Sequence, residues 1–467
     1  MKKELVFILL LLLISIPAVR SLFIPGGFTS HDLTHHVIRQ VDMNRLLSEG
    51  QFPPRWSGEL NNGFGYPVFL FNYPLPALIG ELYHTLGFNF VYSVKAVFFS
   101  SMILSVLGMY LFLNSYLGSR LAAFLGACFY LYAPHRFLNV YVAASVGSAL
   151  GEAILPFVFW AMVEIKQGAR YGWLLLGSMF LALMILSHNI TTLIFSLPII
   201  SFGVILIWQS KNRLELVKKY CLMFLLGFGL SAWFWLPALG EKQYIRFDQI
   251  YNQFYQRQFP SLGQLIRSPW GFGLSHPQNP EPGDLSYEIG IIHFLIILFL
   301  VPAIFLFKKI RLTGLFTIFF FLLSIFLILK ISQPLWAAIP LLYTVQFPLR
   351  FSALSVFMAS VAAALLIKHL PSSKIIFVCL LILVIYANRN HWRINLPYDP
   401  GEQYYLSLKT TTASLDEHLP KWGRAMDKPA LSKIEFAEGG GEVKMLEEKS
   451  AKVVAQVEAT TSSKLRL

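Results

Sequence analysis

Apolar runs of about 20 residues recur along this chain, and they limit the fold more than any other feature of the sequence. A run of this length spans the hydrocarbon core of a bilayer as a helix. Composition agrees, because 55% of the 467 residues are hydrophobic and 13% are charged, against about 25% charged in soluble domains. The sequence therefore predicts an all-α polytopic membrane protein.

The spacing of these runs predicts about 11 transmembrane helices. A further apolar stretch, 67–88, contains three prolines, Pro67, Pro74 and Pro76. Proline disrupts a helix interior, so we interpret this stretch as re-entrant or interfacial. The predicted spans are 4–24, 93–113, 119–133, 148–165, 171–187, 190–208, 220–238, 289–307, 312–329, 351–368 and 374–390.

The distribution of charge predicts the orientation. The formal net charge is +13, which positive-inside bias explains, and we expect no nucleic-acid partner. The expected location is the cell (cytoplasmic) membrane. An inside N-terminus and 11 spans then place the C-terminus outside. The segments then predicted to face inside are short, poor in acids and rich in basic residues: Lys2, Lys3, Arg120, Lys166, Arg170, Lys211, Arg213, Lys218, Lys219, Lys308, Lys309, Arg311, Lys368 and Lys374.

Two domains are expected. Residues 1–391 form the multi-span membrane domain, with long outer loops at 25–92 and 240–288 that are candidates for function. Residues 392–467 form an extracytoplasmic tail in which "EVKMLEE", "KVVAQVEA" and "SKLRL" have the pattern of strands. Three short strands cannot bury a core, so the sequence predicts an incomplete β-rich domain and a truncated chain.

The first outer loop begins with "PGGFTSHDLTHHVIRQ" (25–40), in which polar residues cluster after a span. Thr29 to Asp32 fit a helix-capping pattern and Gly50 a helix stop, which predicts a helix over 30–49. Asp32 has three interpretations. It caps the helix, stabilising it by about 0.5–2 kcal/mol; it binds a metal, with His31 and His35 at zinc-like spacing or as a looser divalent-cation ligand; or it is a catalytic acid or base.

Several stretches in order resemble one known family: "HDLTHHVIRQVDMNRLLSEGQFPPRWSGELNNGFGYPVFLFNYPLP", "GSALGEAILPFVFWAM", "LSHNITTLIFSLP", "GFGLSAWFWLPALGE", "IPLLYTVQFPLRF" and "DEHLPKW". Together they resemble the "6-pyruvoyl-tetrahydropterin synthase-related" membrane proteins of the GT-C glycosyltransferase superfamily. The three-histidine zinc site of the soluble synthase is not visible. One departure is Val146, where the family pattern leads us to expect an Arg.

The resemblance implies a GT-C-like fold and transfer of a sugar from a polyprenyl-phosphate-linked donor at the outer face of the cell envelope. It also implies that an acid in the first outer loop is catalytic or binds a metal, and Asp32 is the matching position. A divalent cation is therefore a candidate cofactor, with the metal left open. The bilayer and the lipid-linked donor are the expected partners, and the sugar and acceptor are unspecified.

Four further residues make up the predicted substrate-binding set: His35, Glu152, His188 and Arg350. Glu152 lies early in a span, where a carboxylate faces the protein interior either as a site residue or as a structural partner. His188 lies at a turn between two spans, which a plain helical hairpin also explains. Arg350 offers a planar fork for phosphate or an interfacial charge.

His135 and Arg136 are weaker phosphate candidates, and the aromatic run 244–259 either stacks on sugars or lies at the membrane interface. Two other functions remain open at this stage. A transporter or lipid flippase would explain the spans, although transporters tend to carry ionisable groups at midplane. A non-catalytic membrane scaffold is the second alternative.

Overall fold

The computed structural model describes residues 2–168, 171–370, 373–430 and 432–466. The chain divides into two compact units. Unit 1 comprises residues 1–33, 95–232 and 251–399, and unit 2 comprises 34–94, 233–250 and 400–467. The expected domain boundary at residue 391 remains a prediction, and the tail from residue 400 belongs to the same unit as part of the first outer loop.

The predicted helical, multi-span fold is confirmed. Among the described residues, 7 apolar helices are long enough to cross a membrane by length and composition, and 4 more apolar helices are shorter. These match the 11 expected spans one by one. They are α1 (Lys2–Val19), α5 (Phe90–Leu117), α6 (Arg120–Leu131), α8 (Val146–Lys166), α9 (Gly172–Ser187), α10 (Asn189–Trp208), α11 (Arg213–Glu241), α14 (Ile291–Leu306), α15 (Arg311–Ile328), α18 (Ser352–His369) and α19 (Ser373–Ala387).

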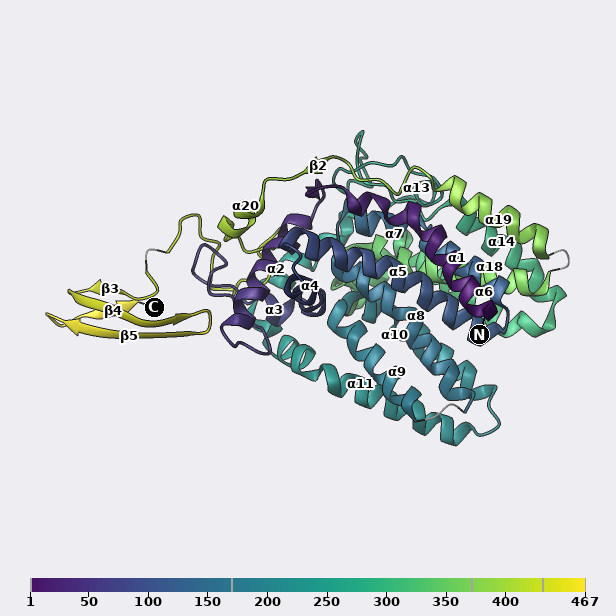
Figure 1. Ribbon diagram of the computed structural model, residues 1–467, viewed down its shortest axis with the longest axis horizontal. Helices are drawn as coiled ribbons and strands as arrows, with labels where there is room; N and C mark the ends of the chain where they lie inside the picture. The colour runs from purple at the N-terminus through teal and green to yellow at the C-terminus, as the bar shows by residue number, and fades with distance from the viewer. Residues whose placement is uncertain (1, 169–170, 371–372, 431, 467) are drawn as a thin grey trace. The chain divides into compact units, whose positions relative to one another are not determined.

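Helix α18 forms the centre of unit 1. It is apolar on every side and buried from Ser352 to Ile367, as expected for a helix surrounded by others. It packs against α6, α14, α15 and α19. A Cβ atom at Gly126 of α6 would lie only 2.9 Å from the Ser360 carbonyl oxygen, so this glycine permits the close approach of α6 and α18. Helices α8, α9 and α10 pack against one another beside this core (Figure 1).

Short elements connect the long helices of unit 1. Two strands, β1 (Gly27–Phe28) and β2 (Pro397–Tyr398), pair antiparallel, with Gly27 opposite Tyr398. The remaining turns of unit 1 are η1 (Arg20–Phe23), α7 (Pro134–Phe137), η2 (Leu138–Val142), η4 (Phe254–Arg257), α13 (Leu262–Ile266), η5 (Lys308–Ile310), η6 (Lys330–Ser332), α16 (Gln333–Ala338), α17 (Pro340–Tyr343) and η7 (Pro348–Phe351).

Unit 2 has its own small core. The predicted helix over 30–49 is observed as α2 (Leu33–Ser48), and Gly50 follows it with φ +80°. Met43 and Leu46 of α2 pack with Tyr66, Phe69 and Leu419. The proline-containing stretch 67–88 forms two short helices, α3 (Val68–Phe71) and α4 (Leu75–Thr85). The other helical segments of unit 2 are η3 (Lys242–Tyr244), α12 (Phe247–Tyr251, its last residue in unit 1) and α20 (Glu402–Ser407).

The expected strands of the tail are present, drawn in yellow in Figure 1. They are β4 (Gly441–Lys449), β5 (Lys452–Ala459) and β6 (Lys464–Arg466), joined by one strand that was not expected, β3 (Glu435–Glu438). Strand β4 pairs antiparallel with β5, and β3 with β6. Side chains of β4 and β5 alternate between exposed and half-buried, so these strands bury no core of their own.

Candidate active site

The segment that carries Asp32 is held in place by several parts of unit 1. Lys95 is 3% exposed, and its ammonium donates hydrogen bonds of 2.6 Å to the carbonyl oxygens of Ile24 and Gly26. The β1–β2 pair follows, and the Thr29 N–H donates to the Leu396 carbonyl oxygen at 2.9 Å. Each of these bonds fixes the backbone a few residues before Asp32.

Asp32 itself is fixed by its backbone. The N–H groups of His31 and Asp32 donate to the carbonyl oxygens of Val142 and Ala143, each at 3.0 Å. The His31 ring adds a bond from Nε2 to the Gly273 carbonyl oxygen at 2.9 Å. Nε2 must carry the proton to make that bond.

The Asp32 carboxylate, in contrast, has no hydrogen-bond or ion-pair partner among the residues that the structure describes, and its side chain is partly exposed. The expected cap at this helix start comes from Ser30 instead, whose Oγ accepts from the Leu33 N–H at 3.3 Å. A firmly held backbone thus presents a carboxylate with both oxygens available.

The segment whose carbonyl oxygens accept the His31 and Asp32 N–H bonds has unusual backbone geometry. Residues Leu138–Val142 form a π-helical turn, η2, a rare conformation that is frequently found at functional sites. Ala144, two residues later, has φ +51°, where a Cβ atom is unfavourable. The Ser145 N–H bonds to the Asn139 carbonyl oxygen at 2.8 Å and closes this loop.

Glu152 lies in the second turn of α8 and is 2% exposed. Arg136 Nη1 donates to Oε2 at 2.6 Å, and Asn139 Nδ2 donates to Oε1 at 2.8 Å. His135 Nε2 lies 3.2 Å from the same Oε1. Of the two interpretations left open for Glu152, this geometry favours the structural partner, because both carboxylate oxygens are occupied.

Arg136 is the positive partner in this pair and is 1% exposed. Its guanidinium carbon lies 5.2 Å from the centre of the Tyr130 ring, within cation–π range. Among the described residues, its Nε and Nη2 atoms have no hydrogen-bond partner. Only one edge of the guanidinium is used by Glu152, and the other edge retains two donors.

His188 caps α10. Its Nδ1 accepts from the Thr191 N–H at 3.1 Å, and its Nε2 lies 3.4 Å from Ser148 Oγ. Burial lowers the pKa of His188 to about 3; the Arg350 charge acts in the same direction and Glu152 opposes it. The ring is therefore neutral and can donate from Nε2 without supplying positive charge.

Arg350 lies in η7, just before α18. Its Nη1 atom donates to the Val345 carbonyl oxygen at 2.9 Å and to Gln346 Oε1 at 2.6 Å. Its charge acts on His188, as does that of Glu152. Glu152 and Arg350, which are distant in sequence, thus both act electrostatically on His188 within unit 1. His35 lies in the first turn of α2, in unit 2.

No preformed metal site surrounds Asp32 in the described part of the chain. The described residues contain one group of three potential ligands, His276, Glu281 and Asp284, which lies in the predicted second outer loop. His31 uses Nε2 for a backbone carbonyl, which weakens the predicted pairing of His31 and His35 on zinc. The residues around Asp32 therefore do not fit a protein-built metal site.

Sequence reasoning missed two residues of the Glu152 cluster, Asn139 and Tyr130. Tyr130 donates from its hydroxyl to the Glu152 carbonyl oxygen at 2.7 Å. Asn139 follows His135 by four residues, a spacing that places both on one helical face, so this signal was present in the sequence. Nothing in the sequence around Tyr130 indicates its role.

Comparison with known proteins gives one sequence relative and several structural neighbours. No family model matches the chain, so the resemblance to the 6-pyruvoyl-tetrahydropterin synthase-related family stays a prediction. An uncharacterized protein of Lactococcus lactis subsp. cremoris (strain MG1363) is 26% identical over 246 residues, which is 50% of this chain and 39% of that protein.

The solved structures that resemble this chain include two bound to lipid phosphates. ArnT from Cupriavidus metallidurans, bound to undecaprenyl phosphate, matches 82% of this chain and 64% of its own, with 11% identity and a TM-score of 0.46. The Archaeoglobus fulgidus oligosaccharyltransferase AglB, in complex with an inhibitory peptide and a dolichol-phosphate, matches 89% and 60%, with 12% identity and a TM-score of 0.47. The chain spans less than two thirds of each protein it matches here. Similarity at this level says nothing about the chemistry of this chain's site.

Proposed function

We propose that this chain is a GT-C-type membrane glycosyltransferase that transfers a sugar from a polyprenyl-phosphate-linked donor to an acceptor at the outer face. The observation that carries the proposal is the contrast between two carboxylates. Both oxygens of Glu152 are taken by buried donors, whereas Asp32 is held by its backbone and its carboxylate has no partner among the described residues. ArnT and AglB are each bound to a lipid phosphate of the proposed class.

In the proposed reaction, an acceptor hydroxyl attacks the anomeric carbon of the donor sugar. A new carbon–oxygen bond forms, the bond to the phosphate oxygen breaks, and the polyprenyl phosphate leaves with the bonding electrons. Asp32 accepts the hydroxyl proton. General-base catalysis of this kind contributes about 10²–10⁴ in rate. Because the surroundings of Asp32 do not fit a protein-built metal site, no step is assigned to a cation.

Two arginines are proposed to bind the phosphate. Arg350 supplies positive charge beside His188, and the free edge of Arg136, Nε with Nη2, offers the paired donors that suit a phosphate. Glu152 would hold Arg136 in position, and neutral His188 would donate a hydrogen bond. Because these positive groups would already be in place before the reaction, they would stabilise the leaving phosphate without any rearrangement of the site. His35 stays a predicted substrate-binding residue on its place beside Asp32 in the sequence.

A transfer assay tests the proposal. Purified protein in liposomes is given polyprenyl-phosphate donors with labelled sugars and a mixture of acceptors, and the release of polyprenyl phosphate is followed. We expect release with the wild type and its loss in Asp32→Asn. Movement of intact donor across the bilayer without release would instead support a flippase. Full transfer in Asp32→Asn would overturn the role of this residue.

A further inference from the structure

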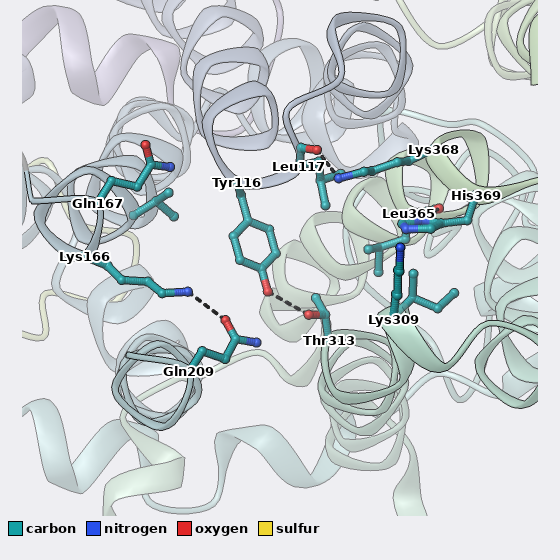
Figure 2. Close-up of a pocket in the computed structure, with 12 residues that line it drawn as sticks. Tyr116, Leu117, Lys166, Gln167, Gln209, Lys309, Thr313, Leu365, Lys368 and His369 are labelled. Carbon is teal, nitrogen blue, oxygen red and sulfur yellow. Dashed lines mark hydrogen bonds between the residues drawn. The ribbon is translucent and has the colours of Figure 1, made fainter. Parts of the chain in front are cut away.

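A cavity of about 480 Å³ lies within unit 1, where several helices end together (Figure 2). Its lining comes from the C-terminal ends of α5, α8 and α18, from the residue after α10, and from η5 with the start of α15. All these segments lie at or beside connections that the sequence predicts to face inside. The cavity is therefore distinct from the Asp32 region, which follows the first span on the predicted outer side.

Positive charge dominates this cavity. Lys166, Lys309, Lys368 and His369 all line it, and no carboxylate is among its described lining residues. The ammonium of Lys166 donates to the neutral Gln209 side chain at 2.9 Å. The ammonium of Lys368 donates to the Leu117 carbonyl oxygen. Neither lysine is neutralised by an ion pair among the described residues.

Lys309 is exposed and is the least explained of these lysines. Within the described residues it has no hydrogen-bond or ion-pair partner, and it points toward His369 (Figure 2). It also lies two residues before the first residue of α15, Arg311. A helix N-terminus carries partial positive charge, so a cation there is unfavourable. An anion in the cavity would remove this conflict.

Two ordinary explanations cover only part of the arrangement. Helix C-termini attract lysine, which accounts for the bond from Lys368 to Leu117 but not for Lys309. Positive-inside bias places basic residues at inner ends, but it does not make them converge on a cavity. The convergence of these lysines, of which Lys309 and Lys368 are exposed, suits a ligand of opposite charge.

We propose that this cavity binds the phosphate of an anionic phospholipid from the inner leaflet. Apolar side chains, among them Val163, Ile310 and Leu365, share the lining with the basic groups, as a headgroup joined to acyl chains requires. Tyr116 and Thr313 add hydroxyls, 2.7 Å apart. Basic pockets between helix ends on the cytoplasmic side bind phosphorylated headgroups in this way. This binding is independent of the proposed transferase activity.

The test measures lipid retention by native mass spectrometry of the purified full chain. Phosphatidylglycerol and phosphatidylcholine are titrated into wild type, Lys309→Gln and the double variant Lys309→Gln/Lys368→Gln. Each lysine near a lipid phosphate is worth about fivefold in affinity. We therefore expect the wild type to bind phosphatidylglycerol more tightly than phosphatidylcholine. Compared with the wild type, the single variant should bind phosphatidylglycerol about fivefold more weakly and the double variant about 25-fold more weakly.

The control double variant is Lys211→Gln/Lys374→Gln, which removes two predicted inner-side cations outside the cavity. It should bind phosphatidylglycerol as the wild type does. Lys309→Gln alone removes no described bond, so its folding should be intact by thermal melting. Equal phosphatidylglycerol affinity in Lys309→Gln and wild type, or equal affinity of wild type for the two lipids, would overturn the proposal. Full displacement of the lipid by inorganic phosphate would also overturn it, in favour of a soluble phosphate ligand.

Discussion

Replacing Glu152 with Gln should destabilise the fold strongly, because Arg136 would remain buried without its counter-charge. The pair is 2.6 Å long, and the side chains are 3% and 1% exposed. Breaking a buried pair by removing one partner costs about 3–5 kcal/mol. The new amide NH₂ would also lie among the donors of Arg136, Asn139 and His135, so we expect the upper part of this range.

The free energy of unfolding in mixed detergent–SDS micelles measures this effect. A matched control is Glu164→Gln on the same helix, whose carboxylate accepts from Ser115 Oγ at 2.6 Å and Trp160 Nε1 at 3.1 Å, with no ion pair among the described residues. Replacing this carboxylate with a neutral amide should weaken those two bonds and lower the free energy of unfolding by at most about 2 kcal/mol.

A double variant, Arg136→Met/Glu152→Leu, distinguishes the contribution of the ion pair to stability from that of the packing around it. Replacing both charges with apolar groups is often neutral or stabilising, so the double variant should recover most of the stability lost in Glu152→Gln. If Glu152→Gln unfolds within about 1 kcal/mol of the wild type, or no differently from Glu164→Gln, Glu152 is not the structural partner described here.

Three further predictions concern the cap, the support of the Asp32 segment and pH. His188→Ala should lower the free energy of unfolding by about 1 kcal/mol and His188→Asn should restore most of it, since Asn also caps; equal losses in both would contradict the cap. Lys95→Met removes two buried bonds to carbonyl oxygens, so amide hydrogen exchange over residues 27–32 should accelerate, and unchanged exchange would contradict the support. Burial raises the pKa of Asp42 to about 6, so the folded state binds this proton more tightly than the unfolded chain. The associated stability is complete below pH about 4 and is lost as the pH rises to about 6 and above. Asp42→Asn should remove roughly 3 kcal/mol of that dependence over the whole range, of which about 1.4 kcal/mol falls between pH 5 and pH 7.5 and would be measured by melting at those two values.

The helices were predictable from sequence because span length and apolarity are local properties. All the expected spans coincide with apolar helices, and α2 begins within a few residues of its predicted start. The strands β4 and β5 were predicted from alternation, whereas β3 lacks a clear pattern and is fixed by pairing with β6. The division into units was not predictable, because it groups residues 34–94 with the tail.

The arrangement of the candidate site was predictable only in part. Glu152, His188 and Arg350 were named from sequence, but their interaction depends on how three separate helix ends pack. The Glu152 cluster depends on α7 and η2 folding back over the start of α8, and a π-helical turn has no reliable sequence signal. A cap at the start of α2 was one of three interpretations of Asp32, whereas Ser30 supplies the cap, since a capping pattern does not decide between adjacent polar residues.

The kinetics of Asp32→Asn test the proposed catalysis. The kcat for release of polyprenyl phosphate and the KM for the donor are measured for wild type, Asp32→Asn and the control Asp284→Asn, which changes an acid on the predicted second outer loop. Loss of a general base should lower kcat by about 10²–10⁴ while leaving KM nearly unchanged, because the substituted asparagine would retain the backbone bonds and the donor phosphate is proposed to bind to Arg136 and Arg350. Asp284→Asn should match the wild type. A kcat of Asp32→Asn within about threefold of the wild type would contradict proton transfer to Asp32.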